Sequence, residues 1–182
     1  PELHVTWLCV TLLSVLYYIY CSEMWNQLDA LTGLLNQNSY LNRTAEMRRS
    51  GGVLVVFDVD DFKQINDRYG HLQGDVCLAE IADCIKKAYA RCGYCYRIGG
   101  DEFVAFCFLD DPHTPDHLCS KIKTLSEHLN ETNGKPYYVD ISLGVSTFIC
   151  NPTLNIEDVL HQADESLYEH KKNKRKDVLK PV

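Results

Sequence analysis

The chain has 182 residues, of which 46% are hydrophobic and 24% are charged. These values are typical of globular proteins and exclude disordered, collagen-like and simple repeat proteins. Acidic residues outnumber basic ones by 25 to 18, for a formal charge of -7. That balance argues against a general nucleic-acid binder, whose surface would be basic. The first residue is Pro1 rather than Met, so we expect a piece of a longer protein.

The nine cysteines do not indicate a disulfide scaffold. Their number is odd, and most lie inside apolar stretches, where cysteine behaves as a small hydrophobic residue. A reduced, cytosolic environment therefore fits the chain better than an oxidising one.

Residues 1–24 stand apart as an apolar helix. Residues 3–22 carry no charge if His4 is neutral, and at ~1.5 Å per residue such a helix is about as long as the hydrocarbon core is thick. Trp7 near one end and the aromatic residues 17–25 at the other are typical of an interfacial belt. This pattern predicts the end of a transmembrane or transmitter segment, with the rest of the chain in the cytoplasm. Thr6, Thr11 and Ser14 dilute the stretch, so a buried or dimerising helix is the alternative.

Residues 25–178 read as one domain, followed by a short tail at 179–182. An apolar, β-branched run predicts a buried strand over 53–59. Alternating and helical patterns then predict the following elements: a helix over 74–91, strands over 94–98 and 103–108, a helix over 115–130, a strand over 137–148 and a helix over 155–172. The glycines at 99 and 100 predict a two-residue hairpin between the two middle strands. The alternation indicates an α/β fold, with one sheet covered by helices.

Two acidic clusters carry the chemistry. One follows the first buried strand at Asp58, Asp60 and Asp61, and the other lies in the hairpin at Asp101 and Glu102. A hard dication such as Mg²⁺ needs only one or two carboxylates when substrate phosphates supply further oxygens. Turns and helix caps are the alternative use of such acids. The paired glycines at 99 and 100 favour a ligand-binding site over a turn or cap, because a backbone without Cβ atoms allows a bulky group to approach.

Residues 99–103 read GGDEF, and the chain around them resembles the GGDEF family of diguanylate cyclases. The similarity extends over four further blocks, which read DALTGLLN at 29–36, FDVDDFKQIND at 57–67 with GH at 70–71 and GD at 74–75, SLGVS at 142–146, and ADESLY at 163–168 followed by Lys171 and Arg175. The resemblance implies a mostly antiparallel five-stranded sheet surrounded by helices, similar to the ferredoxin-like palm of nucleotidyl cyclases and polymerases.

The same resemblance assigns the catalytic centre. Asp58, Asp101 and the main-chain carbonyl of Val59 would be the ligands of Mg²⁺ or Mn²⁺. Glu102 would be a second-metal ligand or a general base. These roles agree with the preference of a hard dication for oxygen ligands.

The resemblance also assigns the substrate site. Asn66 and Asp75 would contact the guanine edge, and a carboxylate at Asp75 would accept from donors that adenine lacks. On position alone, Asp75 and Asn66 could instead be helix caps. His71 would be a pocket wall or a local structural contact. Three cations would bind the triphosphate while Gly99 and Gly100 let it approach: Lys63, in the turn after the first strand, and Lys171 and Arg175, on one face of the last helix. We expect the other basic residues of this tail to be solvated.

The implied function is the condensation of two GTP molecules into cyclic di-GMP and two pyrophosphates. Each domain would hold one GTP, so two domains would face one another in a homodimer set by an upstream sensor and the N-terminal helix. A GTP-binding signalling module with little or no activity is the alternative. Synthesis of a mixed adenine–guanine dinucleotide is disfavoured by Asp75.

The chain departs from the family pattern at several positions. The RxxD product-inhibition motif would fall on Ala90 and Gly93, so we expect no feedback through that site. Gln37 and Asn38 replace a frequent Arg-Arg pair, and Lys174 and Lys176 replace the usual Gly and Asn of the last helix. Cys92 and Cys95 form a CxxC, which we interpret as two ordinary thiols because a zinc site would need two more ligands; a redox or metal role is the alternative.

Overall fold

The computed structural model describes residues 2–108, 115–132 and 134–178. The elements in chain order are α1 (Glu2–Trp25), β1 (Leu35–Asn36), α2 (Gln37–Ser50), β2 (Gly52–Val59), α3 (Phe62–Tyr69), α4 (His71–Tyr89), β3 (Gly93–Arg97), β4 (Glu102–Cys107), α5 (Pro115–Thr132), β5 (Ile141–Phe148) and α6 (Ile156–Val178). The chain is therefore the expected α/β fold.

The strands form one five-stranded sheet in the order β1-β3-β4-β2-β5. Only β1 and β3 run parallel, and the other three pairings are antiparallel. This confirms the mostly antiparallel five-stranded sheet. Strand β2, which lies between β4 and β5, places Asp58 opposite Glu102 of β4 and opposite Ser142 of β5, so the register brings the two acidic clusters together at one end of the sheet.

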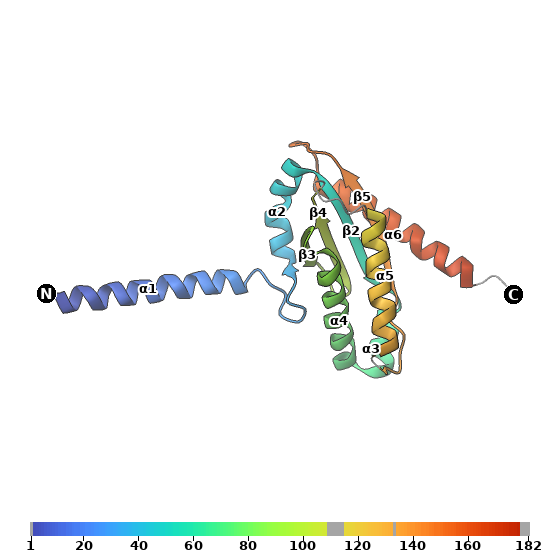
Figure 1. Cartoon of the computed structure of the whole chain (residues 1–182), viewed down its shortest axis with the longest axis horizontal. Helices are drawn as coiled ribbons and strands as arrows, with labels where there is room; N and C mark the ends of the chain where they lie inside the picture. Colours follow the sequence, from blue (N-terminus) through green and yellow to red (C-terminus); the bar gives the residue numbers. More distant parts are fainter. Residues whose placement is uncertain (1, 109–114, 133, 179–182) are drawn as a thin grey trace.

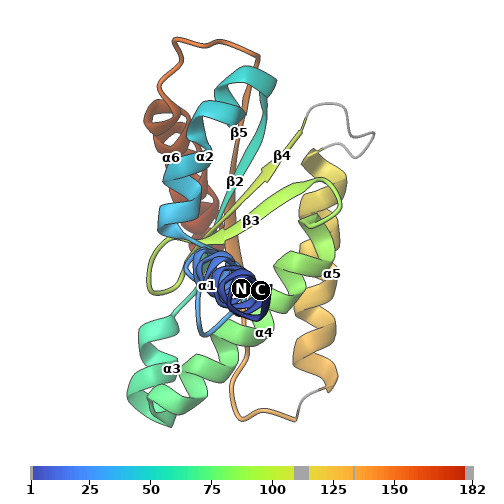
Figure 2. The same cartoon turned by 90° about the vertical axis from the view of Figure 1, so that its left-hand side faces the viewer.

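Helices cover both faces of the sheet, with α4 and α5 on one side and α2 and α6 on the other (Figure 2). Successive residues of β2 alternate between two buried clusters. Val55 and Phe57 pack with α4, whereas Leu54 and Val56 pack with α2 and α6. A strand buried on both faces explains why residues 53–59 read as one continuous apolar run.

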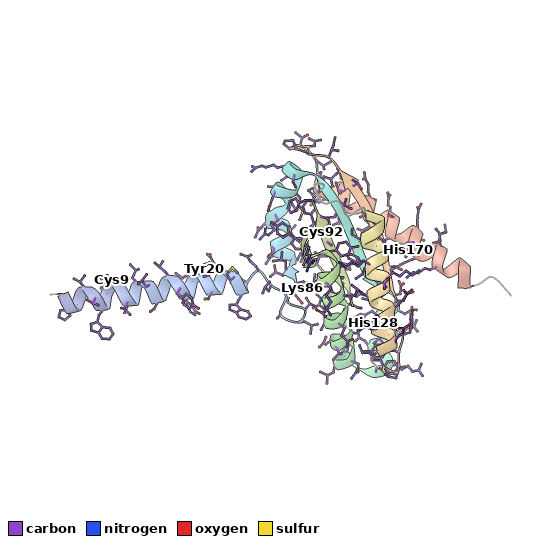
Figure 3. The ribbon with its side chains drawn as sticks, in the orientation of Figure 1. Cys9, Tyr20, Lys86, Cys92, His128 and His170 are labelled. Atoms are coloured by element: carbon purple, nitrogen blue, oxygen red, sulfur yellow. The ribbon has the colours of Figure 1, made fainter. Side chains whose placement is uncertain are left out.

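The N-terminal helix α1 projects away from the sheet and its helices (Figure 1). Its stretch His4–Trp25 is 22 residues long, is apolar enough to cross a membrane and has no buried residues. The side chains of Cys9 and Tyr20 point outward from this helix (Figure 3). Its apolar residues lie all round the helix rather than on one face, so the helix has no distinct stripe for packing against the domain.

Two elements and one connection differ from the expected bounds as follows, and α6 also continues beyond the expected residue 172 to Val178. Helix α4 begins at His71 rather than Gly74, directly after Gly70, whose positive φ of 85° ends α3. The hairpin between β3 and β4 has a four-residue connection at 98–101 rather than a two-residue turn. Strand β5 begins only at Ile141, because Asn130 of α5 takes both main-chain hydrogen bonds of Val139 (2.7 and 2.8 Å).

Helix α2 is an element that hydrophobic periodicity did not predict. Only three of its side chains, Ser39, Tyr40 and Met47, are buried. Asn36 caps its N-terminus, because the Asn36 side chain accepts a hydrogen bond from the Ser39 amide at 3.0 Å. The cap and a few anchoring side chains position a helix whose sequence is mostly polar.

Candidate active site

Asp58 lies at the end of β2, half-buried between two neighbouring strands. Burial raises the pKa of its carboxyl group, and the carboxylates of Asp101 and Asp60 raise it further, while a hydrogen bond from Lys171 acts in the opposite direction. The Lys171 ammonium group donates to Asp58 Oδ1 at 2.6 Å. Helix α6 thus places a cation directly on the carboxylate expected to bind metal.

Asp60 binds a second cation of the same helix. Lys174 Nζ lies 3.0 Å from Asp60 Oδ2 and 3.0 Å from Asp140 Oδ1, and it donates to the carbonyl of Ile141 at 2.9 Å. Ser142 Oγ also lies within hydrogen-bonding distance of the Asp60 carboxylate. The expectation that Lys174 would be solvated is therefore wrong, because α6 lies along β5 and brings this side chain over the end of the sheet.

The GGDEF turn is held by Arg97, the last residue of β3. The Arg97 guanidinium donates twice to the Gly100 carbonyl, at 2.7 and 3.1 Å, and its third nitrogen bonds Asp29 at 3.0 Å. Burial alone would raise the pKa of Asp29, but hydrogen bonds from Thr32 and Arg97 lower it overall. This link between the DALTG segment and the hairpin was not predicted, because Arg97 lies outside the motif residues that were singled out.

The hairpin presents Asp101 and Glu102 beside Asp58. Burial raises the pKa of Glu102, and the charges of Asp101, Asp164 and Asp58 raise it further. The Glu102 side chain packs against Gly99, where an added Cβ would lie 2.6 Å from Oε2. Gly100 faces open space, so the backbone there is accessible to a ligand.

This arrangement fits a divalent metal ion. The negative charge of Asp101 contributes to the raised pKa of Asp58 and to that of Glu102, and a dication bound by Asp58 and Asp101 would reduce this repulsion. In the described part of the chain, no three His, Cys, Asp or Glu side chains converge on one point. A set of two carboxylates and a main-chain carbonyl is compatible with that finding, since Mg²⁺ retains waters and takes substrate oxygens.

Asn66 and Asp75 lie on consecutive helices. Asn66 is half-buried in α3, and its Oδ1 lies so close to Gly74 of α4 that a Cβ at Gly74 would collide with it. Asp75 directly follows Gly74, and its side chain is exposed. We call these three residues the α3–α4 junction. Neither Asn66 nor Asp75 caps a helix N-terminus, because α3 begins at Phe62 and α4 begins at His71. The alternative that these two side chains are helix caps is therefore wrong.

The remaining expected substrate contacts lie around this junction and the acidic end of the sheet. Lys63 is exposed in the first turn of α3, inside the helix rather than in the preceding turn, and His71 is exposed at the first residue of α4. Arg175 belongs to α6, one turn after Lys171, but its side chain lies outside the described part of the structure.

The thiols of the CxxC segment lie away from these carboxylates. Cys92 and Cys95 are buried at the start of β3, and burial raises the pKa of Cys95 to about 12. Figure 3 shows Cys92 within the body of the domain. None of the nine cysteines, all of which lie among the described residues, forms a disulfide bond, and a thiol with a raised pKa is a poor nucleophile and a poor metal ligand.

Comparison with known proteins identifies the family. The model of the family described as diguanylate cyclase, GGDEF domain, matches residues 26–177. The chain belongs to the GGDEF family of diguanylate cyclases. It is 34% identical over 159 residues to diguanylate cyclase DgcS of Shewanella oneidensis, covering 84% of this chain and 52% of that protein. It is 33% identical over 147 residues to diguanylate cyclase A of Treponema denticola, covering 80% of this chain and 39% of that protein. The chain thus spans about half or less of these relatives.

Solved structures of GGDEF domains share the fold. The coiled coil and GGDEF domain of DgcB from Caulobacter crescentus, in complex with c-di-GMP, gives a TM-score of 0.82 at 19% identity, covering 94% of both chains. Diguanylate cyclase SiaD of Pseudomonas aeruginosa, in complex with its activator SiaC, gives 0.73 at 26% identity, covering 90% of this chain and 67% of that one. The palm-like fold expected from the sequence is confirmed.

This GGDEF domain has no room for an acid at the second RxxD position. Gly93 begins β3, and a Cβ there would collide with the Phe106 carbonyl of β4. The first position, Ala90, is exposed at the end of α4. The packing of β3 against β4 thus agrees with the presence of glycine, rather than aspartate, at the second RxxD position.

Proposed function

We propose that this GGDEF domain is a diguanylate cyclase that condenses two GTP molecules into cyclic di-GMP and two pyrophosphates. The observation that carries the proposal is the juxtaposition of Asp58 with Asp101 and Glu102 at the end of β2, next to an open Gly100. A degenerate hairpin would favour a binding module without activity; here every residue of the GGDEF sequence is present.

In this proposal Asp58 and Asp101 are metal ligands, and Glu102 is the general base. Asp58, Asp101 and the Val59 carbonyl would hold Mg²⁺ or Mn²⁺, and the ion would supply neutralisation of charge on the α-phosphate and on the leaving pyrophosphate. Glu102 accepts the proton of the attacking 3′-hydroxyl as the new oxygen–phosphorus bond forms and the bond to pyrophosphate breaks. Its raised pKa supports this role, because a more basic carboxylate is a better proton acceptor.

Cations of the domain bind the triphosphate. Lys171 is placed on Asp58 at 2.6 Å, close enough for a nucleotide phosphate at the metal to take over this ammonium group. Lys63 approaches from α3, and Arg175 lies one turn beyond Lys171 on α6. Positioning and charge neutralisation then supply most of the rate acceleration.

The α3–α4 junction selects guanine. Asp75 accepts hydrogen bonds from N1–H and the 2-amino group, and Asn66 contacts the same base edge, with His71 at the margin. Adenine offers no such pair of donors, so ATP would leave a desolvated carboxylate without a partner. Two facts support the assignment: both side chains are free of helix-capping roles, and Asn66 lies against Gly74, next to Asp75.

Catalysis requires a homodimer, since one domain holds one GTP and the 3′-hydroxyl must come from the other. We further propose that α1 attaches the chain to the membrane and transmits the geometry set by an upstream sensor. Three features support membrane attachment: the helix is long enough to span, apolar on all sides and without buried residues. The GGDEF domain, a cytoplasmic type of domain, would lie on the inner side.

The activity is tested with the purified chain in lipid nanodiscs, incubated with Mg²⁺ or Mn²⁺ and either GTP or ATP. We expect cyclic di-GMP and two pyrophosphates per product from GTP and no product from ATP. Binding of GTP without any product, under conditions where the chain is dimeric, would instead establish the signalling-module alternative.

Membrane attachment is tested by flotation with liposomes. We expect the chain to float with them and the double variant Leu8→Lys, Leu13→Lys to stay in the soluble fraction, because charges in a spanning helix are costly. Leu72→Lys is the matched control, since Leu72 is 82% exposed and belongs to α4 rather than to α1. Flotation of the double variant at the level of the unaltered chain would contradict the proposal.

A further inference from the structure

Two lysines of α6 form ion pairs with two carboxylates at the end of β2. Lys171 lies 2.6 Å from Asp58 Oδ1 and 3.9 Å from Asp60 Oδ1, whereas Lys174 takes the other oxygen of Asp60 at 3.0 Å. The two lysines lie one helical turn apart and so occupy the same face of α6. Their division of the carboxylates is unequal: Lys171 favours Asp58, and Lys174 covers Asp60.

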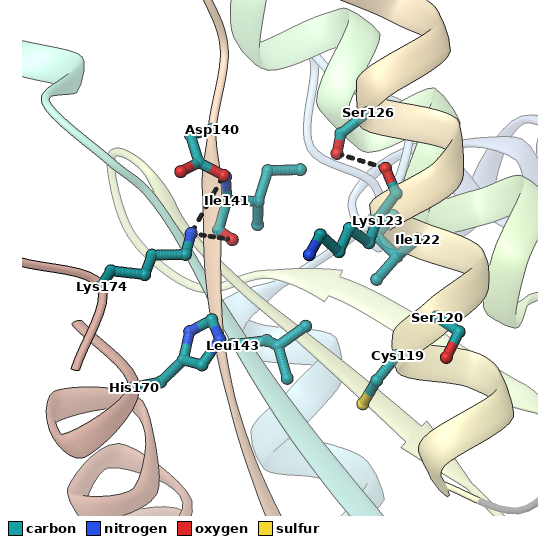
Figure 4. A pocket seen from close by; sticks show the side chains of 10 residues that line it. All are labelled: Cys119, Ser120, Ile122, Lys123, Ser126, Asp140, Ile141, Leu143, His170 and Lys174. Carbon is teal, nitrogen blue, oxygen red and sulfur yellow. Dashed lines mark hydrogen bonds and ion pairs between the residues drawn. The ribbon is translucent and has the colours of Figure 1, made fainter. Parts of the chain in front are cut away.

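Lys174 also joins α6 to the start of β5. Its ammonium group lies 3.0 Å from Asp140 Oδ1 and donates to the Ile141 carbonyl at 2.9 Å, and both contacts can be followed in Figure 4. A cavity of about 230 Å³ between α5, β5 and α6 adjoins these contacts, with Lys174 among its lining residues. One ammonium group therefore holds Asp60, Asp140 and the first residue of β5 together.

We propose that Lys174 is a positioning residue, which neutralises Asp60 so that Lys171 remains available to Asp58 and the nucleotide phosphates. Without Lys174, the Lys171 ammonium would be the nearest cation to both Asp58 and Asp60. A lysine that is already paired with two carboxylates attracts a third anion, such as a phosphate, less strongly than a lysine paired with one.

This inference rests on the proposed function, because it concerns how the triphosphate is bound. It differs from that function in what it predicts: Lys174 acts through Asp60 and Lys171 and touches no substrate atom. Removing the charge of Asp60 should therefore remove the need for Lys174.

The test measures the binding of a GTP analogue with a methylene bridge between the α- and β-phosphates, which cannot react. Calorimetry with Mg²⁺ compares the unaltered chain with Lys174→Met, and Lys172→Met is the matched control because Lys172 is exposed on the same turn. We expect Lys174→Met to weaken binding by about tenfold, within the usual range of coupling between charged neighbours, and Lys172→Met to leave it unchanged.

The double variant Lys174→Met, Asp60→Asn separates positioning from general stability. We expect it to regain most of the lost affinity, and the same variant to recover the KM for GTP, since asparagine leaves no charge to divert Lys171. Additive loss in the double variant, or unchanged binding in Lys174→Met, would overturn the inference. Failure of the proposed function looks different: the unaltered chain would bind the analogue and respond to these substitutions but form no cyclic di-GMP.

Discussion

Asp58 and Glu102 stand opposite one another on two hydrogen-bonded strands, whereas Asn66 and Asp75 stand on two helices that meet at Gly70. The first pair is fixed by strand register at one end of the sheet, where the buried part of β2 and β4 gives way to more exposed residues. The second depends on how closely α3 packs against α4, where Asn66 occupies the space that a side chain at Gly74 would need. In the proposed function, the acidic end of the sheet performs the chemistry and the α3–α4 junction selects the base.

The largest effect is expected at the acidic end of the sheet. Asp101→Asn should lower turnover by roughly a thousandfold or more, because the amide is a poor metal ligand and cannot carry the ligand charge. Folding should be unaffected, since Asp101 lies in the turn between β3 and β4 and asparagine has nearly the same volume. Product formation and thermal unfolding are measured together, with the exposed Glu127→Gln of α5 as the control. Normal turnover would show that Asp101 is no metal ligand.

A smaller and different effect is expected at the junction. Asp75→Ser should weaken GTP use by about 1–3 kcal/mol for one lost charged hydrogen-bonding partner and should permit measurable use of ATP. Loss of a helix cap cannot account for this result, because α4 begins at His71. The exposed Asp83→Ser, two turns further along α4, is the control. Full preference for GTP in Asp75→Ser would place base recognition elsewhere.

The packing of the junction gives a finer test. Gly74→Ala introduces a Cβ that collides with Asn66 Oδ1, so the Asn66 side chain must rotate away. Loss of one neutral hydrogen bond to the base corresponds to about 0.5–1.5 kcal/mol, seen as a higher KM for GTP with little change in kcat. Gln73→Ala changes the preceding, exposed residue and should leave both constants unaltered. A fall in kcat alone would contradict a role in base binding.

The smallest effect concerns product inhibition. Cyclic di-GMP added well above cellular levels should cause no noncompetitive inhibition, because Ala90 and Gly93 occupy the RxxD positions and Gly93 has no space for a side chain. Steady-state kinetics at several GTP concentrations measure the type of inhibition. Tight binding of product outside the active site, seen by calorimetry, would refute this expectation.

The sequence predicted the sheet well and its surroundings less well. The apolar run at 53–59 predicted β2 correctly, because a strand that is buried on both faces is apolar at nearly every position. Helix α2 escaped notice because few of its side chains are buried, and the late start of β5 depends on Asn130, a residue from a different element. Contacts of this kind between distant segments leave no local periodicity.

The site shows the same division. The resemblance to the family assigned Asp58, Asp101, Asn66 and Asp75, since each belongs to a contiguous motif block. The roles of Arg97 on Asp29 and Lys174 on Asp60 connect blocks that are far apart in the chain. Lys174 stood out in the sequence only as a departure from the usual glycine, and its partners became apparent only from the packing of α6 along β5.

The most direct test supplies both nucleotides at once. The chain in nanodiscs, incubated with Mg²⁺ and equimolar GTP and ATP, should yield cyclic di-GMP with two pyrophosphates per molecule, identified by mass spectrometry. That result requires the acidic end of the sheet to perform the condensation and the α3–α4 junction to reject adenine in the same reaction. A mixed adenine–guanine cyclic dinucleotide, or release of pyrophosphate without a cyclic product, would contradict this account.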